Sequence, residues 1–142
     1  MTEGTLVYAD TSAFLKLVVT EDHTDALREW ATDNEVAFVS SDLLRTEALR
    51  AVRHQDAQVR TAVRDELAVV RCLRVSRAIC DIATELHPSV MRTLDAVHVA
   101  TALSVAPDVD TLVTYDRRMA EAARSVGLPV AHPGRRSMAD RQ

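Results

Sequence analysis

Two short apolar segments of the sequence each end directly at an aspartate. Residues 5–9 run into Asp10, and residues 111–115 run into Asp116. Short segments rich in β-branched and aromatic residues predict buried strands, and each is followed here by apolar residues at helical spacing. A chain that alternates strands with amphipathic helices is typical of an α/β fold with a mostly parallel sheet. This repeated strand, aspartate and helix pattern limits the fold more than any other feature.

The rest of the chain continues the alternation. Further strands are predicted at residues 36–39, 72–75 and 128–130. Helices are predicted at residues 11–18, 22–31, 43–52, 58–70, 79–86, 94–105 and 117–126. Thr11 and Ser12 are the predicted N-cap of the first helix, and Gly127 the C-cap of the last. We expect one domain over residues 1–134 and a frayed polar tail over residues 135–142.

Composition fits an ordinary globular chain. The 142 residues are enough for a hydrophobic core, and the hydrophobic share of 47% is unexceptional. No apolar run approaches the ~18 residues of a membrane span, and the N-terminus lacks the basic region of a signal peptide. We therefore expect a cytoplasmic protein without membrane contact, in which Cys72 and Cys80 are reduced thiols.

The formal net charge of −4 is unusual for a protein that binds nucleic acid, because phosphates attract basic surfaces. Lys16 is the only lysine, so nearly all the positive charge is arginine, which is the better bidentate phosphate ligand. The charge alone neither indicates nor excludes RNA.

Four acidic residues stand out by their context. Asp10 and Asp116 follow strands, and the carboxyl ends of parallel strands line the ligand crevice of an open sheet. The alternative is that each aspartate only caps the helix that follows it. Glu47 and Asp95 lie inside apolar helical segments. Their alternatives are a surface ion pair of Glu47 with Arg50 and a buried salt bridge of Asp95 with an arginine.

Carboxylates gathered in one crevice fit a hard divalent cation. Mg²⁺ and Mn²⁺ prefer oxygen ligands, and Mg²⁺ is usually held by carboxylates together with waters and substrate phosphate. Such a metal activates water and neutralises charge during phosphodiester hydrolysis. The four acids therefore predict a metal-dependent hydrolase that uses metal-activated water.

At these residues the sequence resembles the PIN-domain family, and more narrowly the VapC-type toxins of type II toxin–antitoxin pairs. The matching segments are residues 8–14 (YADTSAF), 46–50 (TEALR), 94–102 (LDAVHVATA) and 113–119 (VTYDRRM). Each segment alone is a weak signal. Their order and spacing cover essentially the whole chain, and together they are specific.

The resemblance implies a Rossmann-like three-layer α/β/α sandwich with a central sheet of four to five strands. It implies that Asp10, Glu47, Asp95 and Asp116 are catalytic and surround Mg²⁺ or Mn²⁺, with Ser12 and Thr114 as hydroxyls that orient the site. It also implies an endoribonuclease that forms a homodimer, binds a cognate VapB-type antitoxin and assembles with it into a larger complex. Within the family, a housekeeping nuclease and a catalytically silent RNA-binding module are the alternatives.

Other residues and other folds are weaker candidates. His98 lies three residues after Asp95, and we expect it to be a packing residue more than a general base or ligand. Arg50, Arg117 and Arg118 are possible substrate contacts that the sequence does not rank. Phosphatases and receiver domains with an aspartate nucleophile normally use a downstream lysine, and none follows Lys16.

Overall fold

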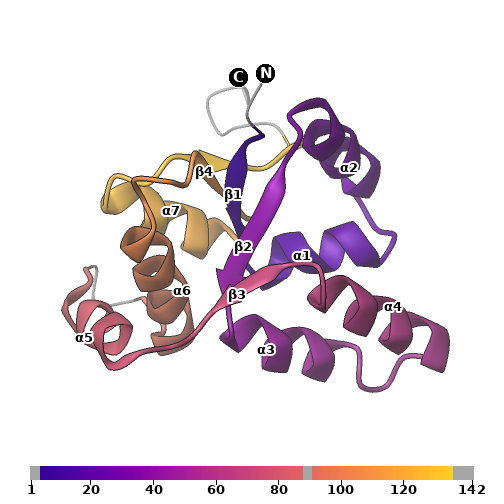
Figure 1. The fold of residues 1–142 in the computed structure, drawn as a ribbon, viewed down its shortest axis with the longest axis horizontal. Helices are drawn as coiled ribbons and strands as arrows, with labels where there is room; N and C mark the ends of the chain where they lie inside the picture. Colours follow the sequence, from indigo (N-terminus) through magenta and orange to yellow (C-terminus); the bar gives the residue numbers. More distant parts are fainter. Residues whose placement is uncertain (1–3, 88–90, 136–142) are drawn as a thin grey trace.

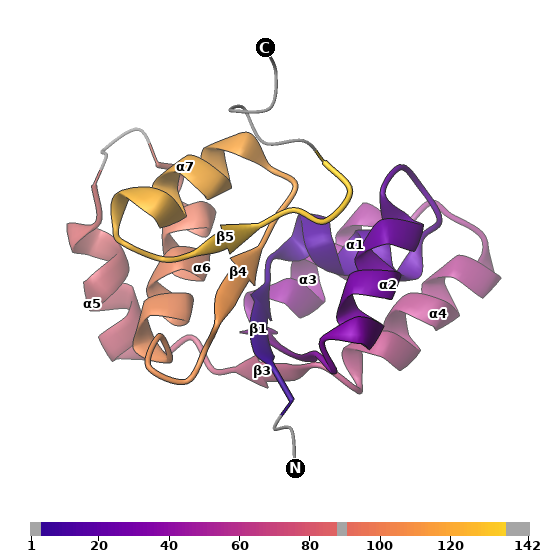
Figure 2. The same ribbon diagram turned by 90° about the horizontal axis from the view of Figure 1, so that it is seen from above.

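The computed structural model describes residues 4–87 and 91–135. Five parallel strands form one sheet in the order β3-β2-β1-β4-β5 at the centre of the molecule (Figures 1 and 2). The strands are β1 (Leu6–Ala9), β2 (Ala37–Ser41), β3 (Arg71–Leu73), β4 (Thr111–Val113) and β5 (Val130–Ala131). The predicted α/β fold with a parallel sheet is confirmed.

Helices cover the sheet on both sides. They are α1 (Thr11–Val18), α2 (Thr24–Asp33), α3 (Leu43–Ala51), α4 (Ala57–Leu67), α5 (Arg77–Glu85), α6 (Thr93–Ser104) and α7 (Arg117–Ser125). In Figure 1, α1 to α4 lie on one side of the sheet and α5 to α7 on the other. Because α1 contacts β1 while α6 contacts β2 and α7 contacts β5, the molecule has the expected three layers.

The central strand β1 is buried on both faces. Val7 and Ala9 pack toward one face with Leu27 of α2, and Tyr8 packs toward the other with Val99 of α6. Successive side chains of a strand point to opposite faces, so a strand covered by helices on both sides must be apolar throughout. This double burial explains why the sequence shows a continuous apolar run at this point.

The cap of α1 differs from the prediction. Asp10, not Thr11 or Ser12, is the N-cap, and its carboxylate accepts a hydrogen bond from the backbone N–H of Ala13. Asp116 caps α7 in the same way. Both aspartates have extended backbone conformations, which aim the side chain back at the first turn of the helix. The hydroxyls of Thr11 and Ser12 are left free to bond to other groups.

Several helices and strands begin or end a few residues away from their predicted boundaries. Helix α2 begins at Thr24, because His23 before it has a φ of 70°, and α4 ends at Leu67 instead of residue 70. Strand β4 ends at Val113, two residues before its predicted end. Helix α7 ends at Ser125 with Val126, not Gly127, as its C-cap, and Gly127 follows with a φ of 85°, a left-handed conformation that commonly terminates a helix.

Strand β1 is the point of the sheet at which the strand order reverses. Strands β2 and β3 add to one edge of β1, and β4 and β5 add to the other edge. Ala9 of β1 lies opposite Val113 of β4, so the carboxyl ends of these two strands are neighbours. A crevice forms where the connections diverge on either side of such a switch point. The topology therefore brings Asp10 beside residues 114–116.

Three other predictions concern the periphery. Cys72 and Cys80 are free thiols, as expected. Within the described residues, no helix is both long enough and apolar enough to cross a membrane. The predicted tail over residues 135–142 lies mostly outside the described residues. Arg135, which is described, donates a hydrogen bond to the backbone carbonyl of Tyr115 at 2.7 Å.

Candidate functional site

Asp10 is held by donors from three residues and is almost entirely buried, with 3% of its surface exposed. Its Oδ1 accepts hydrogen bonds from Ser12 Oγ at 2.7 Å and from the backbone N of Ala13 at 3.0 Å. Its Oδ2 accepts from Thr114 Oγ1 at 2.5 Å. Burial raises the pKa of Asp10, and these hydrogen bonds offset only part of that effect.

The hydroxyls of Ser12 and Thr114 also join the ends of β1 and β4. The backbone N of Tyr115 donates to Ser12 Oγ at 2.9 Å, and that of Asp116 donates to Thr114 Oγ1 at 3.0 Å. Each hydroxyl therefore contacts Asp10 on one side and the loop after β4 on the other. The structure places both residues where they can orient the site.

Glu47 on α3 is bonded from two other helices through a single oxygen. Its Oε1 accepts from Thr11 Oγ1 of α1 at 2.8 Å and lies 2.6 Å from Nε2 of His98 on α6. Burial by itself would raise the pKa of Glu47, but the His98 and Thr11 contacts outweigh it and lower that pKa. Among the described residues, Glu47 makes no ion pair with Arg50.

His98 is buried, as expected of a packing residue, but it is also part of a polar chain. Its side chain is 2% exposed, and its Nδ1 lies 2.7 Å from the hydroxyl of Tyr8. The two rings meet edge to face, with centroids 5.9 Å apart. Both ring nitrogens therefore have protein partners, which leaves neither free to act on a substrate.

Asp95 lies in the first turn of α6 and lines a cavity of about 610 Å³. The lining residues are Glu47, Arg92, Thr93, Leu94, Asp95, Asp116, Arg117 and Arg118. Partial burial raises the pKa of Asp95, and repulsion from Asp116 and Glu47 raises it further. No arginine of the described residues forms a salt bridge with Asp95.

The structure thus brings three of the four predicted acids to one cavity. Asp10 does not line this cavity, but hydrogen bonds connect it to residues that do. The Thr114 hydroxyl bonds both to Asp10 and to the backbone N of Asp116, and Thr11, which follows Asp10 in the chain, bonds to Glu47. Neither Arg92 nor Thr11 was predicted to be a residue of the site. Thr11 lies within a motif that had been recognised, whereas nothing in the sequence marked Arg92.

The donor chemistry of the cavity fits a hard divalent cation, although the side chains do not form a closed cage. Among the described residues, no group of three or more His, Cys, Asp or Glu side chains is placed to hold an ion. Mg²⁺ rarely needs such a cage, because it is commonly bound by one or two carboxylates together with waters and phosphate. Glu47, Asp95 and Asp116 supply only oxygen donors and meet that requirement.

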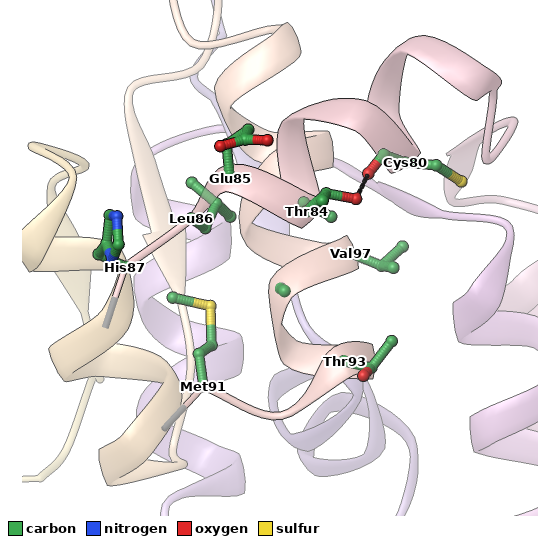
Figure 3. Close-up of a pocket in the computed structure, with 10 residues that line it drawn as sticks. Cys80, Thr84, Glu85, Leu86, His87, Met91, Thr93 and Val97 are labelled. Carbon is green, nitrogen blue, oxygen red and sulfur yellow. Dashed lines mark hydrogen bonds between the residues drawn. The ribbon is translucent and has the colours of Figure 1, made fainter. Parts of the chain in front are cut away.

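A second cavity lies away from the acids, between α5 and α6. It has a volume of about 530 Å³, and its lining includes Cys80, Thr84, His87, Met91 and Val97 (Figure 3). None of the four predicted acids lines it. The chemistry expected from the sequence therefore belongs to the cavity at the N-terminal end of α6.

Comparison with known proteins identifies the family. A sequence model of the PIN domain matches residues 7–125. The chain belongs to the PIN domain family. Ribonuclease VapC46 of Mycobacterium tuberculosis is 42% identical to this PIN domain over 127 residues, covering 89% of this chain and 97% of the relative. Ribonuclease VapC35 of the same species is 38% identical over 133 residues, covering 91% and 98%.

Solved structures show the same fold. The crystal structure of Mycobacterium tuberculosis VapC20, a Sarcin-Ricin loop cleaving toxin, matches this PIN domain with a TM-score of 0.70 at 14% identity. The match covers 89% of this chain and 99% of that one. VapBC2 from Rickettsia felis, bound to a DNA fragment from its promoter, matches with a TM-score of 0.66 at 15% identity, covering 91% and 99%. At these identities the likeness concerns the fold.

The geometry of Asp10 argues against the rival aspartyl-nucleophile mechanism. A nucleophilic carboxylate needs an oxygen that is open to the substrate. In this PIN domain both oxygens of Asp10 accept hydrogen bonds and the residue is 3% exposed.

The raised pKa of Asp95 predicts a pH-dependent gain in stability from Asp95→Asn in metal-free protein. In the folded state the pKa lies above the unfolded value of about 3.9, so the ionised carboxylate lowers the free energy of unfolding once the pH rises through the folded-state pKa. Asp95→Asn in EDTA should therefore raise the free energy of unfolding at pH 7 and change it little at pH 3.

Urea denaturation at both pH values measures this difference, and Asp81→Asn on the exposed face of α5 is the matched control. A lower stability of Asp95→Asn at pH 7 in EDTA would contradict the predicted direction.

Proposed function

We propose that this PIN domain is an endoribonuclease that hydrolyses RNA phosphodiester bonds with a divalent cation. The observation that carries the proposal is the cavity in which Glu47, Asp95 and Asp116 lie together with three arginines. Two relatives that match over nearly their whole length are named ribonucleases. Acidic and basic side chains in one cavity suit a substrate whose phosphate is anionic and whose hydrolysis needs a cation.

The arginines account for phosphate binding despite the net charge of −4. Arg92 precedes α6, and Arg117 and Arg118 begin α7, so guanidinium groups come from two helix N-termini. A guanidinium can donate two parallel hydrogen bonds to a phosphate, and helix N-termini attract anions. Three guanidinium groups therefore stand at the site and can meet the phosphate, although the chain as a whole is acidic.

One or two carboxylates from among Glu47, Asp95 and Asp116 would hold Mg²⁺ or Mn²⁺ in this cavity together with waters and substrate phosphate, and Asp10 would support the same centre. When bound, such a cation lowers the pKa of water and offsets charge on the phosphate oxygens. Asp10 and Asp95 both have raised pKa values, so their ionised forms are disfavoured without a nearby cation. Ser12 and Thr114 hold the Asp10 carboxylate in one orientation.

The carboxylates predict a loss of activity without a loss of fold. Asp95→Asn and Asp10→Asn should each lower RNA cleavage by about 100-fold, because each replaces an anionic carboxylate in or beside the metal centre with a neutral amide. Cleavage of a quenched fluorescent RNA of randomised sequence measures the rate. Circular dichroism checks the fold, and Asp81→Asn is the control that should keep wild-type activity.

Metal removal gives an independent prediction. Excess EDTA should abolish cleavage, and added Mg²⁺ or Mn²⁺ should restore it, because the acids repel one another and the substrate phosphate when no cation is present. The same fluorescent RNA assay follows both steps. Undiminished cleavage in excess EDTA would overturn the metal-dependent mechanism.

We also propose that the protein is the toxin of a VapBC-type pair, silenced by a VapB-type antitoxin, and that it acts as a homodimer on cellular RNA in the cytoplasm. Its similarity to relatives named VapC supports this role.

Induced expression should arrest growth, and co-expression of a small open reading frame adjacent to its gene should relieve the arrest. Growth curves and mapping of cleaved RNA ends measure both effects. Unimpaired growth during expression of an active enzyme would favour the housekeeping nuclease instead.

A further inference from the structure

His98 connects the hydrophobic core, through two hydrogen bonds, to the cavity that Glu47, Asp95 and Asp116 line. Its Nε2 lies 2.6 Å from Oε1 of Glu47, and its Nδ1 lies 2.7 Å from the hydroxyl of Tyr8. Tyr8 is on the central strand and fully buried, and His98 is 2% exposed. A chain of three side chains therefore runs from β1 through α6 to α3.

The chemistry of the three groups sets the direction of both hydrogen bonds when the His98 ring is neutral. An ionised carboxylate only accepts hydrogen bonds, so Nε2 must carry the proton that is shared with Glu47. In the neutral imidazole Nδ1 then accepts, and the Tyr8 hydroxyl donates to it. Tyr8 thereby selects the tautomer of His98 that can hold Glu47.

Only one carboxylate oxygen of Glu47 accepts hydrogen bonds from the described residues. Thr11 and His98 both bond to Oε1, and no described residue hydrogen-bonds to Oε2. Glu47 lines the acidic cavity, and its side chain is 25% exposed. The two donors come from α1 and α6, so they fix the carboxylate from different directions.

We propose that His98 is a positioning residue of the nuclease: it holds Oε1 of Glu47, so that Oε2 is presented to the cavity in one orientation, and Tyr8 fixes its tautomer. The inference rests on the proposed ribonuclease activity. His98 does not touch the substrate, because both of its ring nitrogens have protein partners. Groups that orient a metal-binding carboxylate are commonly worth about 10- to 100-fold in activity or metal affinity.

Two substitutions of His98 separate positioning from packing. The amide nitrogen of Gln can stand near the place of Nε2 and donate to Glu47, whereas the shorter Asn cannot reach it. We expect His98→Asn to lower kcat by about 10- to 100-fold with little change in KM, and His98→Gln to recover most of that loss. His54→Asn, at an exposed position, is the control and should match the wild type.

The fluorescent RNA of randomised sequence and saturating Mg²⁺ provide the assay, with Asp95→Asn measured in parallel. Equal cleavage by wild type and Asp95→Asn would remove the proposed function itself. If Asp95→Asn is inactive but His98→Asn keeps the wild-type kcat, only the positioning role is overturned. Equal losses in the Gln and Asn variants would also overturn it, because packing alone would then account for the effect.

A spectroscopic test needs neither metal nor RNA. Long-range ¹H–¹⁵N NMR of the protein in EDTA should show His98 as the Nε2–H tautomer, with its Nε2 proton resonance shifted in Glu47→Gln. In Tyr8→Phe, which keeps the ring but removes the donor, the preference for this tautomer should weaken. A wild-type ring in the Nδ1–H form, or a resonance indifferent to Glu47, would refute the proposed chain.

Discussion

A buried carboxylate must be satisfied by donors, and the arrangement of this site follows from how Asp10 meets that requirement. An ionised side chain with 3% exposure would cost several kcal/mol if it had no partners. Its donors come from both sides of the switch point: Ser12 and Ala13 from the start of α1, and Thr114 from the end of β4. Satisfying one charge therefore fixes the relative position of two strand ends.

The positions of Glu47 and Asp116 depend on the hydrogen bonds around Asp10. Thr114 accepts from the backbone of Asp116, and Thr11, next to Asp10, donates to Glu47. Thr114, which orients Asp10, and Thr11, which follows Asp10 in the chain, thus each also bond to a second acidic residue. The cost of gathering like charges is visible in the raised pKa of Asp95, to which repulsion from Asp116 contributes. A cation bound among these acids would reverse that cost, and this is the physical reason to expect metal-dependent activity.

Local sequence patterns predicted the elements well and their ends less well. Strand β1 was recognisable because it is buried on both faces, and the start of α7 was marked by Asp116. Thr11 and Ser12 were predicted to cap α1, yet Asp10 is the N-cap. The hydroxyl of Thr11 bonds to Glu47, and that of Ser12 bonds to Asp10. Several neighbouring residues could cap this helix equally well by local rules, so only long-range partners decide among them.

The sequence by itself determined the fold class and the family and predicted four acidic site residues, because strand and helix periodicity and the spacing of motifs are local properties of the chain. Only the tertiary structure decided which acids share the cavity and which is buried beside it. It also brought Arg92 to the acids and joined His98 to Glu47 across 51 positions of sequence. Such contacts depend on how α3 and α6 pack against opposite faces of one sheet. No local pattern of residues predicts which side chains of two separate helices will meet.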